Sequence, residues 1–247
     1  MLRALFILIV AATASAQDNK EAGLGAALAK NIRERTTAIE NPSVQEYVER
    51  VGRKLAAEIP GANFKYTFAL IADDLGGETH EPLSLPGGYI FVSATLIRSA
   101  ASEAEFAGML AHAMVHPTLV PVRREGSTIP LVFIGGWNGL GSAEPGAAVP
   151  VSLLKRQREN ELHADTQAVP IMFAAGYEPE ALVSYIERAP ATDRDTRVAA
   201  LQQEIQKLPG RSYPAVDTSE FAKIQAQLPA PRSAAPNLIR PTLRPRN

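Results

Sequence analysis

The stretch Ser102-Glu-Ala-Glu-Phe-Ala-Gly-Met-Leu-Ala-His-Ala-Met-Val-His116 carries the clearest structural pattern in this chain. It opens with a capping box, the Ser-x-x-Glu pattern that is typical of a helix start. Pro117 disfavours the helical conformation in the residue before it, so the helix is predicted to end there. Within this helix, His112 and His116 are four residues apart and project from one face. Both imidazoles can therefore bind the same metal ion.

A second helix supplies acidic groups for the same site. It is predicted over Val151–Ala175, with Pro170 expected to kink it, and it contains Glu161-Leu-His-Ala-Asp165. A carboxylate from a second helix is the usual third protein ligand of a two-histidine zinc site. One turn beyond Glu161, Asp165 is placed to accept the free N–H of a ligand histidine and so fix its tautomer. His163 lies about 200° around the helix and is expected to point elsewhere.

The remaining elements predict an α+β domain that is mostly helical. Alternating apolar and polar residues favour a strand from Phe64 to Ile71. Leu83–Pro86 is expected to be a short edge strand that runs into a glycine-rich turn, and Tyr89–Ser93 a further strand. The result is a small sheet, of about three strands, beside the two motif helices. Apolar residues at helical spacing predict further helices at Leu24–Thr37, Ser43–Ile59, Glu178–Glu187 and Arg194–Lys207.

The first sixteen residues have the composition of a secretory signal peptide. A single early charge, Arg3, precedes an apolar run that ends at Ala14-Ser15-Ala16, a small-x-small cleavage pattern. The run is shorter than the roughly 20 apolar residues that a membrane span needs. We therefore expect residues 1–16 to be removed, which leaves no stable membrane span; an uncleaved anchor is the alternative. The chain is expected to be exported, as a bacterial periplasmic or secreted protein.

The composition limits which binding partners the chain can have and which interactions can stabilise its fold. The formal net charge is −1, or −2 once Arg3 is removed, so no overall field favours binding to nucleic acid or to an anionic membrane. The chain has no cysteine, which excludes disulfide bonds and a lipoprotein anchor. Stability must come from the core, for which 46% hydrophobic residues are ample. Residues 17–227 fit one domain by the usual size of about 100–200 residues.

Two segments lack the pattern of a packed element. Between residues 228 and 247, five prolines alternate with four arginines and no acidic residue occurs. This stretch is predicted to be a disordered, basic tail; binding of an acidic or proline-recognising partner is the alternative. Residues 128–150, which surround Trp137, are rich in glycine and alanine, and their composition favours a mobile loop or a short hairpin.

Five segments in this order resemble the gluzincin metallopeptidases of the HtpX and CAAX-prenyl-protease type, especially their exported bacterial members. The resemblance covers most of residues 41–201. The segments are Asn41-Pro-Ser-Val-Gln-Glu-Tyr-Val48, Leu85-Pro-Gly-Gly-Tyr-Ile-Phe-Val92, Ser102–His112, Glu161–Asp165 and Ala175-Gly-Tyr-Glu-Pro179. The resemblance implies a metallopeptidase fold and zinc-dependent cleavage of polypeptides in the periplasm.

The same resemblance implies roles for individual residues. The implied ligands of one zinc ion are His112, His116 and Glu161. Arg197 matches an arginine that the family places near its site. Extended or unfolded polypeptide would pair with the edge strand, which holds a peptide without reading its sequence. The residues of that implied substrate strand are Leu83, Leu85, Pro86 and Gly87.

Three departures from the family bear on its chemistry. The family motif is H-E-x-x-H, whose glutamate acts as the general base toward water, and Ala113 stands at that position. Pro117 follows the second histidine, where the family helix usually continues. The histidine of a distal His-Pro pair is absent from Thr192-Asp-Arg-Asp-Thr-Arg197.

Two hypotheses follow from the missing glutamate. General-base catalysis typically contributes about 10²–10⁴-fold to the rate, so the first hypothesis is a metal-binding but catalytically impaired homologue that binds extended peptide. The alternative is an active zinc endopeptidase that uses a relocated general base. Asp165, Glu105 and His80 are the candidates for that base, and the sequence favours none of them.

Overall fold

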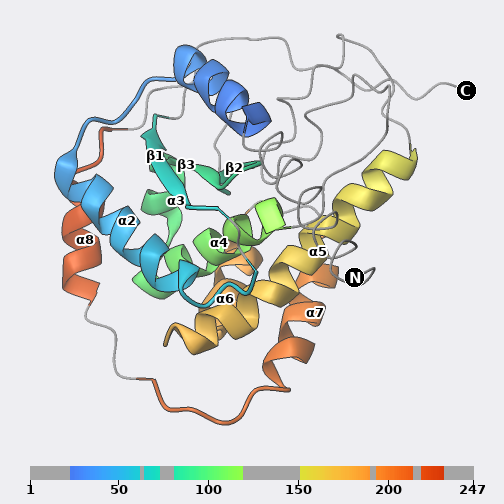
Figure 1. The fold of residues 1–247 in the computed structure, drawn as a ribbon. Coiled ribbons are helices and arrows are strands. Elements are labelled where there is room, and N and C mark those ends of the chain that lie inside the picture. Colours follow the sequence, from blue (N-terminus) through green and yellow to red (C-terminus); the bar gives the residue numbers. More distant parts are fainter. Residues whose placement is uncertain are drawn as a thin grey trace, which may run out of the picture.

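The computed structural model describes residues 23–61, 64–72, 81–118, 151–189, 193–213 and 218–230, with the backbone alone at 151–157 and 218. This part of the chain is mostly helical with one three-stranded sheet, which confirms the predicted α+β class (Figure 1). The helices are a helix over 23–35, α2 (Pro42–Ala56), α3 (Ala94–Ser99), α4 (Glu103–Val115), the 3-10 turn η1 (His116–Thr118), α5 (Val151–Ala174), α6 (Glu180–Arg188), α7 (Arg194–Ile205) and α8 (Thr218–Ala226). The strands are β1 (Thr67–Ile71), β2 (Leu83–Leu85) and β3 (Tyr89–Ser93).

The sheet has the order β1-β3-β2, so β2 lies at an edge, as predicted. β1 runs parallel to β3, and β2 runs antiparallel to it with Leu83 opposite Phe91. The segment before α2 covers the outer edge of β1, because the N–H of Ile39 donates to the carbonyl of Leu70 at 3.0 Å. Among the described residues, no backbone hydrogen bond covers the outer edge of β2.

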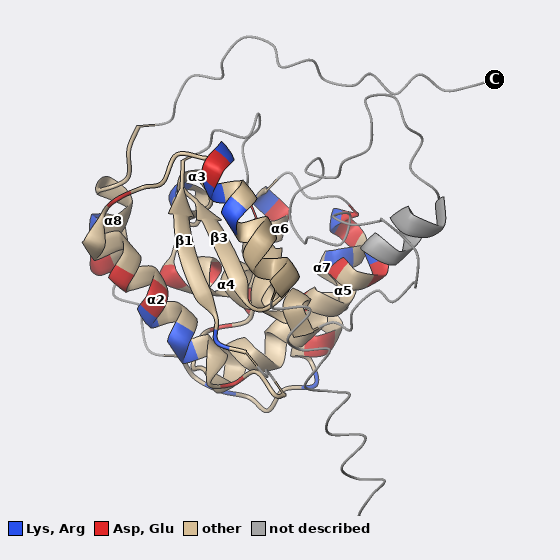
Figure 2. Cartoon of the chain, turned by 45° about the horizontal axis from the view of Figure 1, so that its top comes forward, with Lys and Arg blue, Asp and Glu red and all other residues tan. Residues whose placement is uncertain are grey.

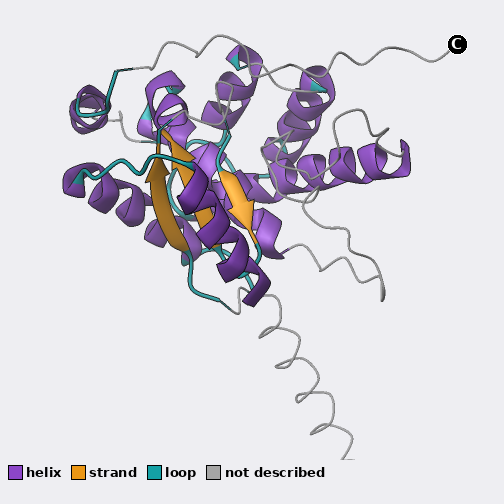
Figure 3. Ribbon diagram, turned by 90° about the horizontal axis from the view of Figure 1, so that it is seen from above, coloured by secondary structure: helices purple, strands orange, loops and turns teal. Residues whose placement is uncertain are grey.

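Helices lie on both faces of the sheet. Side chains alternate across a strand, so Ile90 of β3 faces the main core and Phe91 faces the opposite side. On that side, Phe91 and Leu83 pack against Ala29 and Ile32 of the helix over 23–35. This helix is at the top of Figure 1 and lies across the strands when the molecule is seen from above (Figure 3).

The central helix of the main core is α4, whose residues are buried from Ala104 to Val115. It contacts α5, α6 and α2. Ser102 caps its start, because the N–H of Glu105 donates to the Ser102 hydroxyl at 3.2 Å. The Glu105 carboxylate accepts from the N–H of Ala101 at 2.6 Å, one residue earlier than a standard capping box would place that bond. The predicted start of α4 is thus confirmed, and the helix ends at Val115, directly before η1.

Most predicted elements are present with shorter bounds. The strand predicted from Phe64 begins only at Thr67, because the first residues of that stretch make no ladder hydrogen bonds. The helix α5 continues through Pro170, and Gly176 follows it with a φ of 81°, as expected of a C-cap glycine. Two helices were not predicted. They are α3, which Ser93 caps directly after β3, and α8.

Several predictions fall outside the described residues. They are the signal peptide (1–16), the glycine-rich segment (128–150) with Trp137, and most of the tail. At the start of that tail, Leu228 packs against the main core, and the carbonyl of Pro229 accepts a hydrogen bond from Arg98.

None of the described helices has both the length and the apolar character that a membrane crossing requires. Basic and acidic side chains are mixed along α2 (Figure 2).

Candidate metal centre

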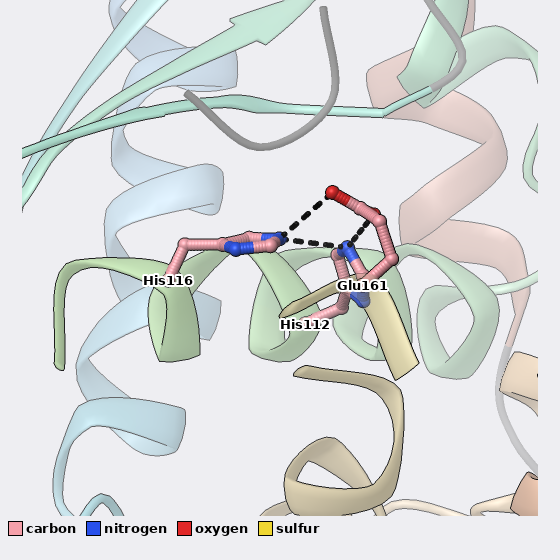
Figure 4. A group of neighbouring side chains, drawn as sticks. All are labelled: His112, His116 and Glu161. Carbon is pink, nitrogen blue, oxygen red and sulfur yellow. Dashed lines mark hydrogen bonds and ion pairs between the residues drawn. The ribbon is translucent and has the colours of Figure 1, made fainter. Parts of the chain in front are cut away.

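Three side chains from successive elements converge on one point (Figure 4). His112 belongs to α4, His116 begins η1, and Glu161 extends from α5. The two Nε2 atoms of the histidines are 3.1 Å apart. The Glu161 carboxylate lies 3.3 Å from Nε2 of His112 through Oε2, and 3.7 Å from Nε2 of His116 through Oε1. The helix spacing predicted from the sequence therefore brings the two histidines and the acid together as expected.

These separations are close to those of a tetrahedral zinc site. Ligand atoms 2.0–2.2 Å from a tetrahedral zinc ion are about 3.3–3.6 Å from one another. The two imidazole nitrogens here are 3.1 Å apart, and Glu161 approaches one through Oε2 at 3.3 Å and the other through Oε1 at 3.7 Å; one ligand atom from each residue lies within 4.8 Å of the other two. Apart from its contact with His112, the buried Oε2 atom of Glu161 has no partner among the described residues, so it is available to a cation. Two imidazoles and one carboxylate are also the donor set that suits zinc.

Asp165 and Arg197 lie behind this group. Nδ1 of His112 is 2.8 Å from Oδ1 of Asp165, although the ring does not align its N–H with that oxygen as a regular hydrogen bond. The Arg197 guanidinium donates to both oxygens of Asp165, from Nε at 2.6 Å and from Nη2 at 2.8 Å. Asp165 is fully buried and Arg197 is 3% exposed. Asp165 lies next to His112, as the helix spacing predicts, whereas Arg197 contacts Asp165 rather than the candidate ligands.

The electrostatics of the cluster favour one positive charge between the ligand atoms. Burial acts to lower the pKa of His112, but the carboxylates of Asp165 and Glu161 outweigh it and raise this pKa to about 10. Burial and the charge of His112 lower the pKa of His116 to about 4. Burial acts to raise the pKa of Glu161, but hydrogen bonding to His112 and its charge lower that pKa to about 2. A proton on His112 or a metal ion can supply the positive charge that these groups require.

The position of the missing general base is buried in α4. Ala113 has no exposed surface and offers a methyl group next to His112. Among the alternative bases, Glu105 is bound to Arg188 at 2.6 and 2.7 Å, so its carboxylate is already engaged. His80 lies outside the described residues, and His163 is exposed and does not join the ligand group, as expected.

The predicted substrate strand lies beside the histidines. β2 contacts both α4 and η1, which carry the two histidines. Leu83 and Leu85 are buried, with their side chains in the cluster that packs against the helix over 23–35. Pro86 and Gly87 follow in a partly exposed turn, where Gly87 has a φ of 76° that favours glycine.

One residue of the cluster was not identified from the sequence. Oε1 of Glu81 accepts a hydrogen bond from Nη1 of Arg197 at 2.8 Å. Glu81 lies two residues before β2 and belongs to no motif. The sequence offers only an indirect indication of Glu81: a buried arginine near a metal site needs acidic partners.

Comparison with known proteins shows that all the described residues of this cluster lie within the part of the chain that matches one protein family. The model of the family described as peptidase family M48 matches residues 40–223, which include every described side chain of the cluster. The chain is 24% identical over 180 residues to a putative beta-barrel assembly-enhancing protease of Vibrio cholerae; this covers 66% of the chain and 36% of that relative. It is 20% identical over 185 residues to the beta-barrel assembly-enhancing protease of Escherichia coli K12, with 68% and 37% covered. The chain thus spans little more than a third of the length of these curated relatives.

Proposed function

Because this chain belongs to peptidase family M48, we propose that it is a zinc-binding peptidase homologue with impaired hydrolysis, which holds extended polypeptide beside its metal site. The observation that carries the proposal is the convergence of His112, His116 and Glu161 with their ligand atoms within 4.8 Å of one another, and with Ala113 in place of the general base. The chain is further proposed to be exported to the periplasm or secreted after loss of residues 1–16.

The charges around the site support retention of a divalent ion. With both histidines neutral, Glu161, Asp165 and Glu81 contribute three negative charges and Arg197 one positive charge. One zinc ion neutralises the remainder. A buried group of like charges without a counter-ion is strongly unfavourable.

The residues of the site are suited to metal binding but not to proton transfer. Zinc, when bound, polarises a carbonyl oxygen and activates water. Asp165 lies 2.8 Å from Nδ1 of His112, and Arg197 binds Asp165, an arrangement that supports the orientation of the candidate ligand. The methyl group of Ala113 can accept no proton, and the loss of a general base lowers rates by about 10²–10⁴-fold.

The edge strand β2 is the proposed holding surface for polypeptide. Its outer edge makes no backbone hydrogen bond with another described residue, and β2 contacts the helical segments that carry both histidines. An extended peptide that added to this edge would satisfy its own backbone groups and lie close to the ligands. The relatives are named as proteases, which supports polypeptide as the class of ligand.

The alternative, an active zinc endopeptidase with a relocated base, is less well supported. Asp165 is bound to Arg197 and lies against His112, and Glu105 is bound to Arg188. Burial acts to raise the pKa of Asp165, but hydrogen bonding to Arg197 and the charge of His112 lower this pKa to about 2, which makes Asp165 a weak base. His80, the remaining candidate, lies outside the described residues.

Zinc content and restoration of the glutamate together test the proposal. We expect the purified protein to hold about one zinc ion per chain. Ala113→Glu should raise hydrolysis of an unfolded protein substrate by about 100-fold or more, and a chelator should abolish that gain. Ala113→Gln, which has the same size but no carboxylate, is the matched control and should stay inactive.

Two results would contradict the proposal in different ways. Zinc below about a tenth of an equivalent would show that the metal site has lost its function. Chelator-sensitive cleavage by the native protein, at a rate like that of Ala113→Glu, would instead establish the relocated-base alternative.

A further inference from the structure

The buried Arg197 joins three parts of the chain that are distant in sequence. Its guanidinium donates from Nε and Nη2 to Asp165 of α5, and from Nη1 to Glu81, which precedes β2. Arg197 itself belongs to α7. Its side chain is 4% exposed, that of Asp165 is fully buried, and that of Glu81 is 20% exposed. The contacts are therefore shielded from water, where charged hydrogen bonds are stronger than at a surface.

These contacts form a continuous path from the edge strand to a metal ligand. Glu81 lies two residues before Leu83, the first residue of β2. From Glu81 the path runs through Arg197 at 2.8 Å to Asp165 at 2.6 Å, and from Asp165 to Nδ1 of His112 at 2.8 Å. Every link is a contact between charged or ionisable groups at hydrogen-bond distance. The start of the proposed peptide-holding strand is thereby tied to the imidazole that would bind zinc.

The planar guanidinium makes this path stiff. Arginine presents its N–H groups in a fixed fork, so the two carboxylates that it binds have a defined relative orientation. A shift of Glu81 turns or displaces the fork, and the fork in turn moves Asp165. Removal of one partner also leaves a buried charge without full compensation. The position of β2 and the orientation of His112 are therefore mechanically and electrostatically linked.

We propose that Glu81 is a positioning residue that couples the placement of β2 to metal binding at His112. The coupling rests on the proposed zinc function of the site. Because linkage between two equilibria is reciprocal, zinc binding holds β2 in the position that accepts a peptide, and a correctly placed β2 raises the affinity for zinc. Glu81 touches neither the metal ligands nor the peptide in this account; it acts through Arg197.

Zinc affinity measured by competition with a chromophoric chelator gives the first test. Glu81→Gln keeps the size of the side chain and removes its charge, and we expect zinc affinity to fall about 10-fold, as for other residues that support metal ligands. The matched control is Glu105→Gln, which removes another buried carboxylate that an arginine binds at 2.6 Å, at the opposite end of α4 from His112. The control should bind zinc like the native protein.

Hydrogen exchange separates positioning from a merely structural role. In the native protein, zinc should slow amide exchange in the peptide that covers residues 81–89, and this slowing should be lost in Glu81→Gln. If Glu81 had only a structural role, Glu81→Gln would instead raise amide exchange in residues 81–89 by the same factor with and without zinc. Glu81→Asp keeps the charge and should recover most of the affinity. If the glutamine variant is poorly folded, Glu81→Ala replaces it in both assays.

These experiments distinguish failure of the Glu81 proposal from failure of the proposed zinc function. A native protein that binds no zinc overturns the metal function, and the Glu81 proposal with it. A native protein that binds zinc, together with a Glu81→Gln variant (or its Glu81→Ala replacement) that matches Glu105→Gln in affinity and in zinc-dependent exchange, overturns the Glu81 proposal alone.

Discussion

Asp165 is shared between His112, a candidate metal ligand, and the guanidinium of Arg197. We expect Asp165→Asn to lower zinc affinity about 10–100-fold, because the amide no longer supports the ligand imidazole by charge. The change also leaves Arg197 buried with less compensation, which should reduce the free energy of unfolding by about 3–5 kcal/mol. Chelator competition and urea denaturation measure the two effects. Asp195→Asn, at a side chain that is 97% exposed, is the control and should change neither quantity.

Single residues of the site differ in how far the sequence reveals them. His112 and His116 could be predicted because their spacing of four matches one helical turn, and Asp165 because it follows Glu161 by the same spacing. Glu81 could not, because its partner Arg197 is 116 residues away and only the tertiary structure brings the two together. The spacing of residues along one helix predicts which candidate ligands share a face of that helix. It does not predict ion pairs between elements that are distant in the sequence.

The helix over 23–35 is held against the sheet by a close approach at Gly25. A Cβ atom at Gly25 would lie 1.7 Å from the backbone oxygen of Pro86, which cannot move aside as a flexible side chain would. We expect Gly25→Ala to displace this helix from the β2–β3 turn and to lower stability by about 1–3 kcal/mol. Faster amide exchange in residues 25–35 and a lower urea midpoint are the readouts.

The same helix offers a matched control for this prediction. Gly23 has nothing within 4 Å of a built Cβ atom, so Gly23→Ala should be neutral or slightly stabilising. Equal stabilities for the two alanine variants would show that the contact between Gly25 and Pro86 does not hold the helix in place.

The short helix α8 contributes more to the core than its length suggests. The ring of Phe221 lies 5.9 Å from that of Tyr47 and 6.1 Å from that of Phe106, measured between centroids. Phe221→Ala should therefore cost about 3–5 kcal/mol of unfolding free energy, as expected for removal of a buried aromatic ring. Lys223→Ala, on the exposed side of the same helix, should cost under 1 kcal/mol. Similar midpoints for the two variants in urea would contradict the assigned packing.

Elements with strong local patterns were predictable and the short ones were not. The start and end of α4 follow from Ser102 and Pro117, even though the helix is buried all round and has no polar face. α8 has two buried apolar side chains, Phe221 and Ile224, in nine residues, too few for a helical period to stand out. α3 follows β3 without an intervening turn, so no glycine or proline separates them.

At the scale of the molecule, four buried tyrosines connect the elements around α4. Tyr47 and Tyr177 both donate hydrogen bonds to the carboxylate of Glu103, at 2.7 and 2.8 Å. Tyr66 donates to the carbonyl of Met114 at 2.6 Å, and the hydroxyl of Tyr185 lies 3.0 Å from that of Ser99. The partners are 48 to 86 residues apart in the sequence, so these hydrogen bonds form only when the tertiary structure has formed. Sequence patterns alone could not predict it.

These tyrosines predict a loss of stability in alkali. Burial is the main cause that raises the pKa of all four phenols above their usual value, which is about 10 in an unfolded chain. Below about pH 10 both states keep the phenol protons and the stabilisation is complete. Above it, only the unfolded chain releases them, so each tyrosine should lower the free energy of unfolding by about 1.4 kcal/mol per pH unit. Urea denaturation between pH 8 and 11 measures this slope.

Tyr66→Phe provides the internal check on that slope. It removes one of the four phenol groups, so the alkaline slope should fall by about a quarter. Absorbance at 295 nm follows ionised tyrosine, and the part of its rise that belongs to these four of the six tyrosines should appear together with unfolding and not before it. A native protein whose buried phenols ionised near pH 10 without unfolding would contradict the packing of Tyr47, Tyr66, Tyr177 and Tyr185. The helices around α4, and with them the two histidines, would then be less tightly assembled than their contacts imply.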